Sequence, residues 1–296
     1  MEARMGWVYL LLVLVASVWG FQPVCIKWLV AEWTPVDITF FRYLIMTVVL
    51  FTIAWTKGLK WRLPRHLWPH IAIMGFSGVL LNCVLQFEGL KTTTVINCTL
   101  ISAMTPALTA MLAAILVRER MGILAWLGIV LSFIGILVVV SHGSLEAVLG
   151  IQFARGDVLC FGSQAAWAVF SVVSIAVLRE LPVISETAWF SLAGAIWTGI
   201  YGLISGEIYL APLDIWGTVS FIYTTFLAGL LMIVVWNYAV KRAGASVSSI
   251  FLNLMPIVGM VSGFLVLGEK IGAAQIAGAV LVIGGVFLTT HMAKSH

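Results

Sequence analysis

Residues 106–122 read PALTAMLAAILVRERMG, and residues 256–272 read PIVGMVSGFLVLGEKIG. In each copy a glutamate follows the proline after thirteen residues, and a glycine follows three residues later. Two further pairs of glycines continue the pattern, each pair 150 residues apart: Gly128 with Gly278, and Gly135 with Gly285. This spacing predicts that the chain consists of two related halves.

The composition places the chain in a membrane. Its 296 residues are 62% hydrophobic and 9% charged, with a mean hydropathy of +1.11. A soluble domain carries about 25% charged residues, so lipid must be the solvent for most of this surface. The net charge of +4 comes from basic residues scattered between apolar runs, which indicates membrane ends and not nucleic-acid binding. The four cysteines lack metal-type spacing and are expected to pack as small apolar residues.

Short polar connections separate ten apolar stretches, each close to the roughly 20 residues that a membrane-spanning helix needs. No long loop or low-complexity tract interrupts them, so no soluble second domain is expected. Nine further stretches follow the first, which favours an uncleaved first helix over a signal peptide. The predicted spans are 7–27, 36–56, 67–89, 93–117, 122–141, 156–178, 185–205, 213–238, 244–266 and 272–291.

Basic residues are distributed unequally between the two ends of these spans. Eleven lie on the side of the N-terminus: Arg4, Lys57, Lys60, Arg62, Arg65, Arg118, Arg120, Arg179, Lys241, Arg242 and Lys294. The other side has four, namely Lys27, Lys91, Arg155 and Lys270. Because cytoplasmic connections are enriched in Lys and Arg, we expect a multi-pass protein of the cytoplasmic (inner) membrane with both termini in the cytoplasm.

Five spans separate the two copies of the repeat. Since five is odd, the second copy crosses the membrane in the opposite direction. We therefore predict an all-α membrane protein with ten transmembrane helices arranged as two inverted five-helix repeats, an architecture common among transporters. The first repeat is expected at residues 1–142, a connecting loop at 143–155 and the second repeat at 156–296.

Several motifs give the chain a family resemblance. They are SVWG at 17–20, FFRYL at 40–44, the mid-span prolines of the fourth and ninth spans, and LGEKIGAAQIAGAVLVIGGV at 267–286. With these motifs the whole chain resembles the EamA family of ten-helix exporters in the drug/metabolite transporter superfamily. The first half departs from the family by having RER in place of a GE pair, and Ala168 replaces the glycine of a second WG. The resemblance implies secondary transport, usually export of amino acids, metabolites or toxic compounds.

The motifs that are missing narrow the function further. The sequence has no GxxxxGK[ST] loop for ATP and no HExxH, CxxC or Gly-x-Ser-x-Gly motif, so we expect neither an enzyme nor a cofactor or metal. Our leading hypothesis is a secondary transporter that exports amino acids or related small amphipathic metabolites by alternating access. The alternatives are efflux of drugs or toxic cations, a facilitative uniporter or importer of a metabolite, and a non-transporting receptor or assembly subunit. The expected partners are a small-molecule substrate and the lipid bilayer, with the chain a monomer or weak homodimer.

Polar side chains inside the spans mark the candidate substrate pocket, because the membrane interior is costly for them. Gly78, Asn82 and Gln86 recur every four residues and so share one helical face. We expect amides to bind a polar substrate group and indoles to contact its apolar part; the alternative is that these side chains join helices. The candidate residues are Trp19, Gln22, Asn82, Gln86, Asn97, Gln164, Trp167, Trp236 and Asn253.

Mid-span prolines are expected to kink two helices. Pro106 and Pro256 each remove a hydrogen bond to the carbonyl four residues earlier, at Ser102 and Leu252 respectively. Such a kink either borders a wet cavity or is tolerated by packing. The nearby Glu119 and Glu269 are interpreted as carboxylates that favour the start of the helix following each.

Arg42 lies about seven residues inside the second span, where a lone cation costs a few kcal/mol. Glu88 ends the third span at the same level, and Asp37 lies one and a half turns from Arg42. We expect Arg42 to form a structural or gating ion pair, with Glu88 as the first partner and Asp37 as the second.

The predicted orientation can be tested by cysteine labelling of intact cells. We expect a cysteine at Ser295 to react only from the cytoplasm and a cysteine at Ser144 to react from outside. Reaction of the Ser295 position with an external, membrane-impermeant reagent would overturn the orientation.

Overall fold

The structure is a computed structural model that describes residues 2–116, 122–146, 153–208, 211–243, 251–252 and 254–292. These residues form helices joined by short connections, and none of the described residues lies in a strand. The all-α prediction is thereby confirmed for the described residues.

Before residue 146, two long helices are followed by two spans that are divided into shorter pieces. The third expected span consists of four consecutive pieces and the fourth of two. The elements are α1 (Glu2–Leu29), α2 (Pro35–Thr56), η1 (Arg65–Leu67), α3 (Trp68–Met74), η2 (Gly75–Leu81), α4 (Asn82–Thr92), α5 (Val95–Ser102), α6 (Thr105–Leu116) and α7 (Ile123–Val140).

After residue 153 the same plan returns, with two long helices followed by a divided span. The elements are α9 (Arg155–Leu178), α10 (Val183–Ser205), α11 (Ile215–Ile222), η3 (Tyr223–Leu231), α12 (Met232–Ala243), α14 (Leu254–Leu267) and α15 (Ala273–Met292).

Seven helical stretches among the described residues are long and apolar enough to cross a membrane: Gly6–Leu29, Pro35–Thr56, Arg65–Thr92, Val95–Ile115, Arg155–Leu178, Val183–Ser205 and Ile215–Trp236. The other three expected spans coincide with shorter apolar helices, Trp126–Val140, Leu254–Leu267 and Ala273–Thr289. The chain is therefore a multi-pass helical membrane protein, and the number of ten crossings stays a prediction.

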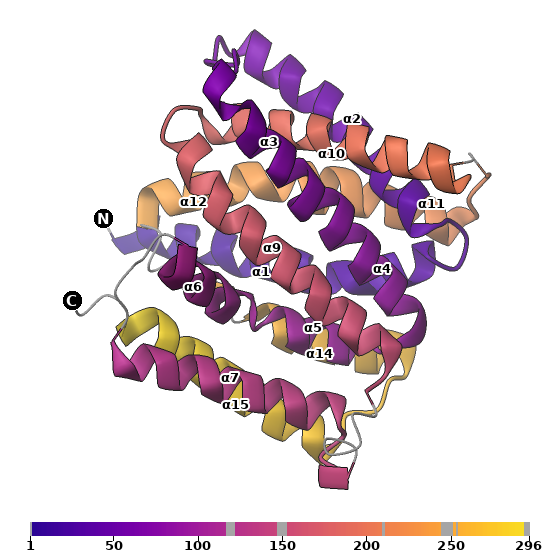
Figure 1. The fold of residues 1–296 in the computed structure, drawn as a ribbon, viewed down its shortest axis with the longest axis vertical. Helices are drawn as coiled ribbons and strands as arrows, with labels where there is room; N and C mark the ends of the chain where they lie inside the picture. Colours follow the sequence, from indigo (N-terminus) through magenta and orange to yellow (C-terminus); the bar gives the residue numbers. More distant parts are fainter. Residues whose placement is uncertain are drawn as a thin grey trace.

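The most extensive helix pairs join the two halves of the chain. The four most extensive contacts are α7 with α15, α2 with α10, α4 with α9 and α1 with α14. Each joins a helix before residue 146 to one after residue 153. In Figure 1, α7 and α15 lie side by side at one end of the molecule, and α2 lies at the opposite end with α10. The two halves therefore share one interior.

The repeated glycines hold α7 and α15 together. A Cβ on Gly128 would lie 2.5 Å from the carbonyl oxygen of Gly285, and a Cβ on Gly135 would lie 3.0 Å from that of Gly278. The partners run in opposite order, so the two helices are antiparallel. Ser132 lies midway and places its Oγ 3.4 Å from the carbonyl oxygen of Val282, the residue 150 positions later. The glycines are thus needed for close backbone approach.

One stretch of wide, π-helical turns occurs in each half. The two stretches, η2 and η3, end at Leu81 and Leu231, which are 150 residues apart. Such turns interrupt the regular hydrogen-bond ladder and are frequent at functional sites. Asn82 follows directly after η2, so the third span changes its winding immediately before a candidate site residue.

Two adjacent glycines in α15 provide a matched test of the helix pair. An added methyl group at Gly285 would overlap the carbonyl oxygen of Gly128, whereas the nearest atom at Gly284 would be 4.0 Å away. Alanine is favoured over glycine in a helix by about 1 kcal/mol, but overpacking costs roughly 1–3 kcal/mol. We expect Gly285→Ala to lower the midpoint of thermal unfolding in detergent and Gly284→Ala to leave it equal or higher. Equal midpoints for the two variants would show that the close approach is not needed.

Candidate functional site

Four helical segments, α4, α5, α6 and α9, bring polar side chains together. Asn82 on α4 donates from Nδ2 to the carbonyl oxygen of Ser163 on α9, at 2.9 Å. Gln164 on α9 accepts a hydrogen bond of 2.7 Å from the hydroxyl of Thr105. Gln86 on α4 reaches Oγ of Ser102 at 3.4 Å. We call this set the central seam: Asn82, Gln86, Ser102, Thr105, Ser163 and Gln164.

The break in the fourth span positions Ser102 and Thr105, two of the three hydroxyl side chains of the seam. Pro106 has no backbone N–H, so α5 ends at Ser102 and α6 begins at Thr105. The carbonyl oxygen of Ser102, which Pro106 leaves without its helical donor, accepts a 2.6 Å bond from the Thr105 hydroxyl. The expected interruption is therefore present, as a break before the proline.

At Pro256, a backbone N–H and not a side chain bonds to the carbonyl oxygen four residues earlier. Pro256 is the third residue of α14, and the carbonyl oxygen of Leu252 accepts from the backbone N–H of Met255 at 3.0 Å. A tighter backbone turn therefore replaces the bond that Pro256 removes. The candidate Asn253 lies outside the described residues.

The hydrogen bonds of the central seam leave it one donor short. The single hydroxyl proton of Thr105 faces two acceptors, the Ser102 carbonyl and Oε1 of Gln164. One hydroxyl supplies one proton, so one acceptor at a time lacks its donor. The half-buried Gln86 has a long and weak bond. The seam can accordingly accept a hydrogen bond from a small polar molecule without losing a strong internal one.

Trp19 and Trp236, both candidate residues, form a separate aromatic cluster. Their ring centroids are 5.7 Å apart, and the indole N–H of Trp19 donates to the carbonyl oxygen of Ala228 at 2.9 Å. Tyr223 on η3 likewise donates to the carbonyl oxygen of Val18 at 2.9 Å. These indole and phenol donors already bond backbone groups between α1 and the α11–α12 span. The Trp19 and Tyr223 donors are therefore already satisfied within the protein.

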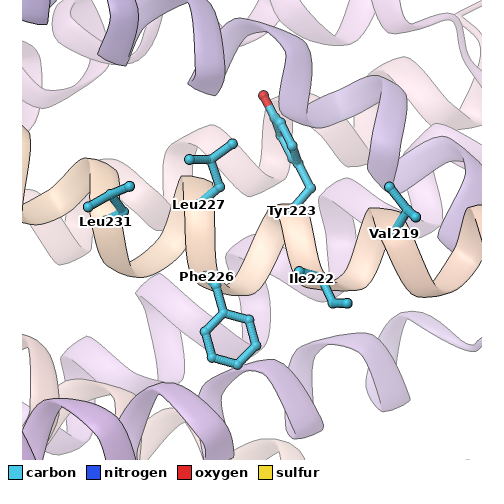
Figure 2. Close-up of a pocket in the computed structure, with 6 residues that line it drawn as sticks. All are labelled: Val219, Ile222, Tyr223, Phe226, Leu227 and Leu231. Carbon is cyan, nitrogen blue, oxygen red and sulfur yellow. The ribbon is translucent and has the colours of Figure 1, made fainter.

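An apolar groove of about 540 Å³ follows the helix beside this cluster. Figure 2 shows Tyr223, Leu227 and Leu231 on one side of the helix, with Phe226 and Ile222 on the other. Val219, Ile222, Phe226 and Leu231 are exposed, as expected for a helix face in contact with lipid. The groove is lined by Val219, Ile222, Tyr223, Phe226, Leu227 and Leu231.

Asn97 belongs to a polar network at the end of the bundle that lies opposite the start of α1. Its amide nitrogen is 3.3 Å from Oδ1 of Asp157, and its Oδ1 accepts from Gln275 at 3.4 Å. Thr93 donates a very short bond to the same Asp157 oxygen. All four side chains are buried, with Asp157 only 1% exposed. We call them the distal network. It joins α5, α9 and α15.

Lys27 and Glu269 extend this network. Lys27 at the end of α1 lies 3.2 Å from Oε1 of Glu269 and donates to the carbonyl oxygen of Thr93 at 2.7 Å. Glu269 accepts from the backbone N–H groups of Val95 and Ile96, at 2.8 and 3.0 Å. Glu269 therefore stabilises the first turn of α5. The sequence had led us to expect it at the start of the following helix, α15, so that interpretation was wrong. Glu119 lies outside the described residues.

Near the distal network lies a polar cavity of about 430 Å³ between α2, α4, α9 and α10. It contains an ion pair, with Lys91 Nζ 2.8 Å from Oε2 of Glu88. Arg155 and Glu207 add one charge of each sign, and neither has an ion-pair partner among the described residues. The lining residues of this distal cavity are Thr34, Pro35, Val84, Glu88, Lys91, Arg155, Tyr201 and Glu207.

The predicted ion pair of Arg42 is not formed in this structure. Glu88 pairs with Lys91, three residues away on the same helix. Asp37 accepts from the Thr34 hydroxyl at 2.9 Å. Arg42 is 6% exposed, takes part in none of the ion pairs of the described residues, and its Nε lacks a hydrogen-bond partner among them. Equal depth in the membrane was therefore insufficient to identify a partner.

Two further candidates, Trp167 and Gln22, take no part in the hydrogen bonds that define the central seam. Trp167 packs against Phe170, with ring centroids 4.5 Å apart, and Gln22 is half-buried on α1. No group of three or more metal-ligating side chains occurs among the described residues. Sequence reasoning omitted several hydroxyl and charged groups, although a Ser, Thr or Gln within an apolar span is itself a signal. The omitted residues are Lys27, Thr93, Ser102, Thr105, Ser163 and Gln275.

Comparison with known proteins gives consistent matches along the chain. A family model described as the EamA-like transporter family matches residues 6–141 and 154–291. The uncharacterized transporter YyaM of Bacillus subtilis (strain 168) is 32% identical over 264 residues, which cover 88% of this chain and 86% of the relative. An uncharacterized transporter of Archaeoglobus fulgidus is 28% identical over 97% of this chain and 98% of its own. A crystal structure of 19% sequence identity matches in fold, with a TM-score of 0.65 over 98% of this chain and 99% of the other.

Glu269 and its neighbour Lys270 form a matched pair for testing the distal network. Glu269→Gln keeps the shape of the side chain but removes the charge opposite Lys27 and one of two acceptors for the start of α5. Loss of such a bond to a buried donor costs about 1–3 kcal/mol. We expect a lower midpoint of thermal unfolding for Glu269→Gln, with no change for Lys270→Gln, whose side chain is exposed. An unchanged Glu269→Gln midpoint would contradict the role given to this carboxylate.

Proposed function

The chain belongs to the EamA-like transporter family, and from this premise we propose that it exports amino acids or related small amphipathic metabolites by alternating access. The observation that carries the proposal is the central seam, where Gln86 and Gln164 lie next to the break in the fourth span. Polar side chains inside a membrane span cost free energy, so their presence there indicates a function. A substrate ammonium group would supply the donor that the seam lacks.

The arrangement of charges favours a zwitterionic substrate. The distal cavity offers the guanidinium of Arg155 and the carboxylate of Glu207, together with the Glu88–Lys91 pair. A cavity with both signs of charge can attract the carboxylate and the ammonium of an amino acid in turn. We infer that this cavity is the vestibule by which substrate leaves, and that the rings of Trp19 and Trp236 suit the apolar side chain of such a substrate.

Alternating access requires two bodies that move about a shared axis. The contacts between α7 and α15 support such an axis, because Ser132 meets Val282, its counterpart 150 residues later. The paired π-helical stretches support the same relation. We propose ten crossings in two inverted repeats, with both termini in the cytoplasm and the chain in the inner membrane as a monomer or weak homodimer. The Lys27–Glu269 pair then closes the external end in this conformation.

Counterflow in proteoliposomes tests the substrate class. Vesicles preloaded with an unlabelled amino acid are mixed with a trace of the labelled compound, over a panel of amino acids and cationic drugs. We expect accumulation for one or more amino acids, with or without a pH gradient. Accumulation of cationic drugs alone would replace the proposal by drug efflux, and uptake that depends on the pH gradient would indicate coupling to protons.

Gln86 provides a test of the central seam. Gln86→Leu has nearly the same volume and removes only the long bond to Ser102, so the abundance in the membrane should stay normal. A lost hydrogen bond to substrate is worth about 1–3 kcal/mol, or roughly five- to hundredfold in affinity. We expect the transport KM to rise by that factor, with no change for the control Thr52→Val, whose side chain is exposed. Wild-type transport by Gln86→Leu would exclude Gln86 from the pocket.

A further inference from the structure

A basic segment connects α2 to the third span. We call residues 57–65, with the sequence KGLKWRLPR, the basic loop. It carries Lys57, Lys60, Arg62 and Arg65, all exposed, and no acidic residue. None of these four side chains forms an ion pair among the described residues. The loop therefore presents four uncompensated positive charges within nine residues.

Contacts with α10 and with the turn that precedes it hold this loop in one position. Lys60 donates from Nζ to the carbonyl oxygen of Glu180 at 3.1 Å, and the indole of Trp189 donates to the carbonyl oxygen of Trp61 at 2.7 Å. The carboxylate of Glu180, the acidic side chain next to the loop, lies 2.7 Å from Nε2 of His66 and pairs with it. The loop is thus preorganised, and its charges are not neutralised by Glu180.

The position of the loop places its charges at the membrane surface. The span Pro35–Thr56 ends immediately before it, and the span Arg65–Thr92 begins at its last residue. Trp55, Trp61 and Trp68 are 73%, 42% and 60% exposed. Exposed tryptophans at span ends lie at the level of the lipid headgroups. The basic side chains and these rings consequently reach the same layer.

We propose that the basic loop is a binding site for anionic phospholipid headgroups. A headgroup phosphate provides the negative charge that the four basic side chains lack, and the adjoining glycerol and acyl carbons can contact the exposed indoles. A basic cluster next to a membrane span attracts anionic lipid, by about fivefold in affinity for each Lys or Arg. A nucleic acid or an acidic protein would match the charge but would not use the indole layer, so lipid is the occupant that both features favour.

Native mass spectrometry of the full-length protein tests this site. The protein is incubated with micelles containing equal amounts of phosphatidylglycerol and phosphatidylcholine with identical acyl chains, and the retained lipids are counted. We expect wild type to retain phosphatidylglycerol preferentially. The triple variant K57Q/R62Q/R65Q should lower the ratio of the two lipids at least tenfold; it leaves Lys60 in place because Lys60 bonds to Glu180.

Three basic residues at the other end of the bundle provide the matched control. K91Q/R155Q/K270Q removes the same charge from exposed positions and should change the ratio less than twofold, and so should the charge-conserving variant K57R/R62K/R65K. The proposal is overturned if K57Q/R62Q/R65Q retains the wild-type ratio, if the control lowers the ratio equally, or if a short RNA displaces the lipid from wild type. Should the triple variant unfold, the single variants Lys57→Gln and Arg62→Gln decide, each with an expected loss of about fivefold.

Discussion

Glu269 accepts two backbone hydrogen bonds from the first turn of α5 and faces the ammonium group of Lys27. The distal end of the bundle depends on this carboxylate. In lipid, the free N–H groups at a helix start have no water to bond, so they must find acceptors within the protein. A loop from the second half supplies the acceptor for a helix of the first half, and a cation at the end of α1 balances its charge. One side chain thereby links α1 and α5 to the connection between α14 and α15.

The same constraint explains how the chain tolerates breaks at its centre. Pro106 interrupts the fourth span and leaves the carbonyl oxygen of Ser102 without its helical donor. The hydroxyl of Thr105 donates to this oxygen instead. In the central seam, the Thr105 hydroxyl replaces the donor that Pro106 lacks. The seam still has one more hydrogen-bond acceptor than it has donors. A transporter needs such a compromise, because groups that are fully satisfied would not bind a substrate and groups left bare would destabilise the bundle.

Hydropathy and spacing predicted the helical class, seven of the ten expected spans as long helices, and the interruption next to Pro106, because these depend on the local chain and on the thickness of the membrane. Of the nine candidate pocket residues, Asn82, Gln86 and Gln164 lie together in the central seam, and their role in binding substrate stays a prediction. The sequence did not predict which side chains would pair in hydrogen bonds and ion pairs. Arg42 and Glu88 were matched by depth, yet Glu88 bonds to Lys91 one turn away on its own helix. Asn97 bonds to Asp157 at the start of α9, and the depth of a residue in the membrane does not say which neighbouring helix its side chain meets.

The contact between Ser132 and Val282 has a consequence for how the two halves of the chain are related. At this point a residue meets its own counterpart, and the glycines on either side exchange partners in the same manner. Two separate half-length polypeptides, packed antiparallel, could form this interface from identical surfaces. The α7–α15 interface therefore has the geometry of a contact between two antiparallel copies of one helix. The two halves differ elsewhere, as α4 and α12 do at Asn82 and at Met232, the residue 150 positions later.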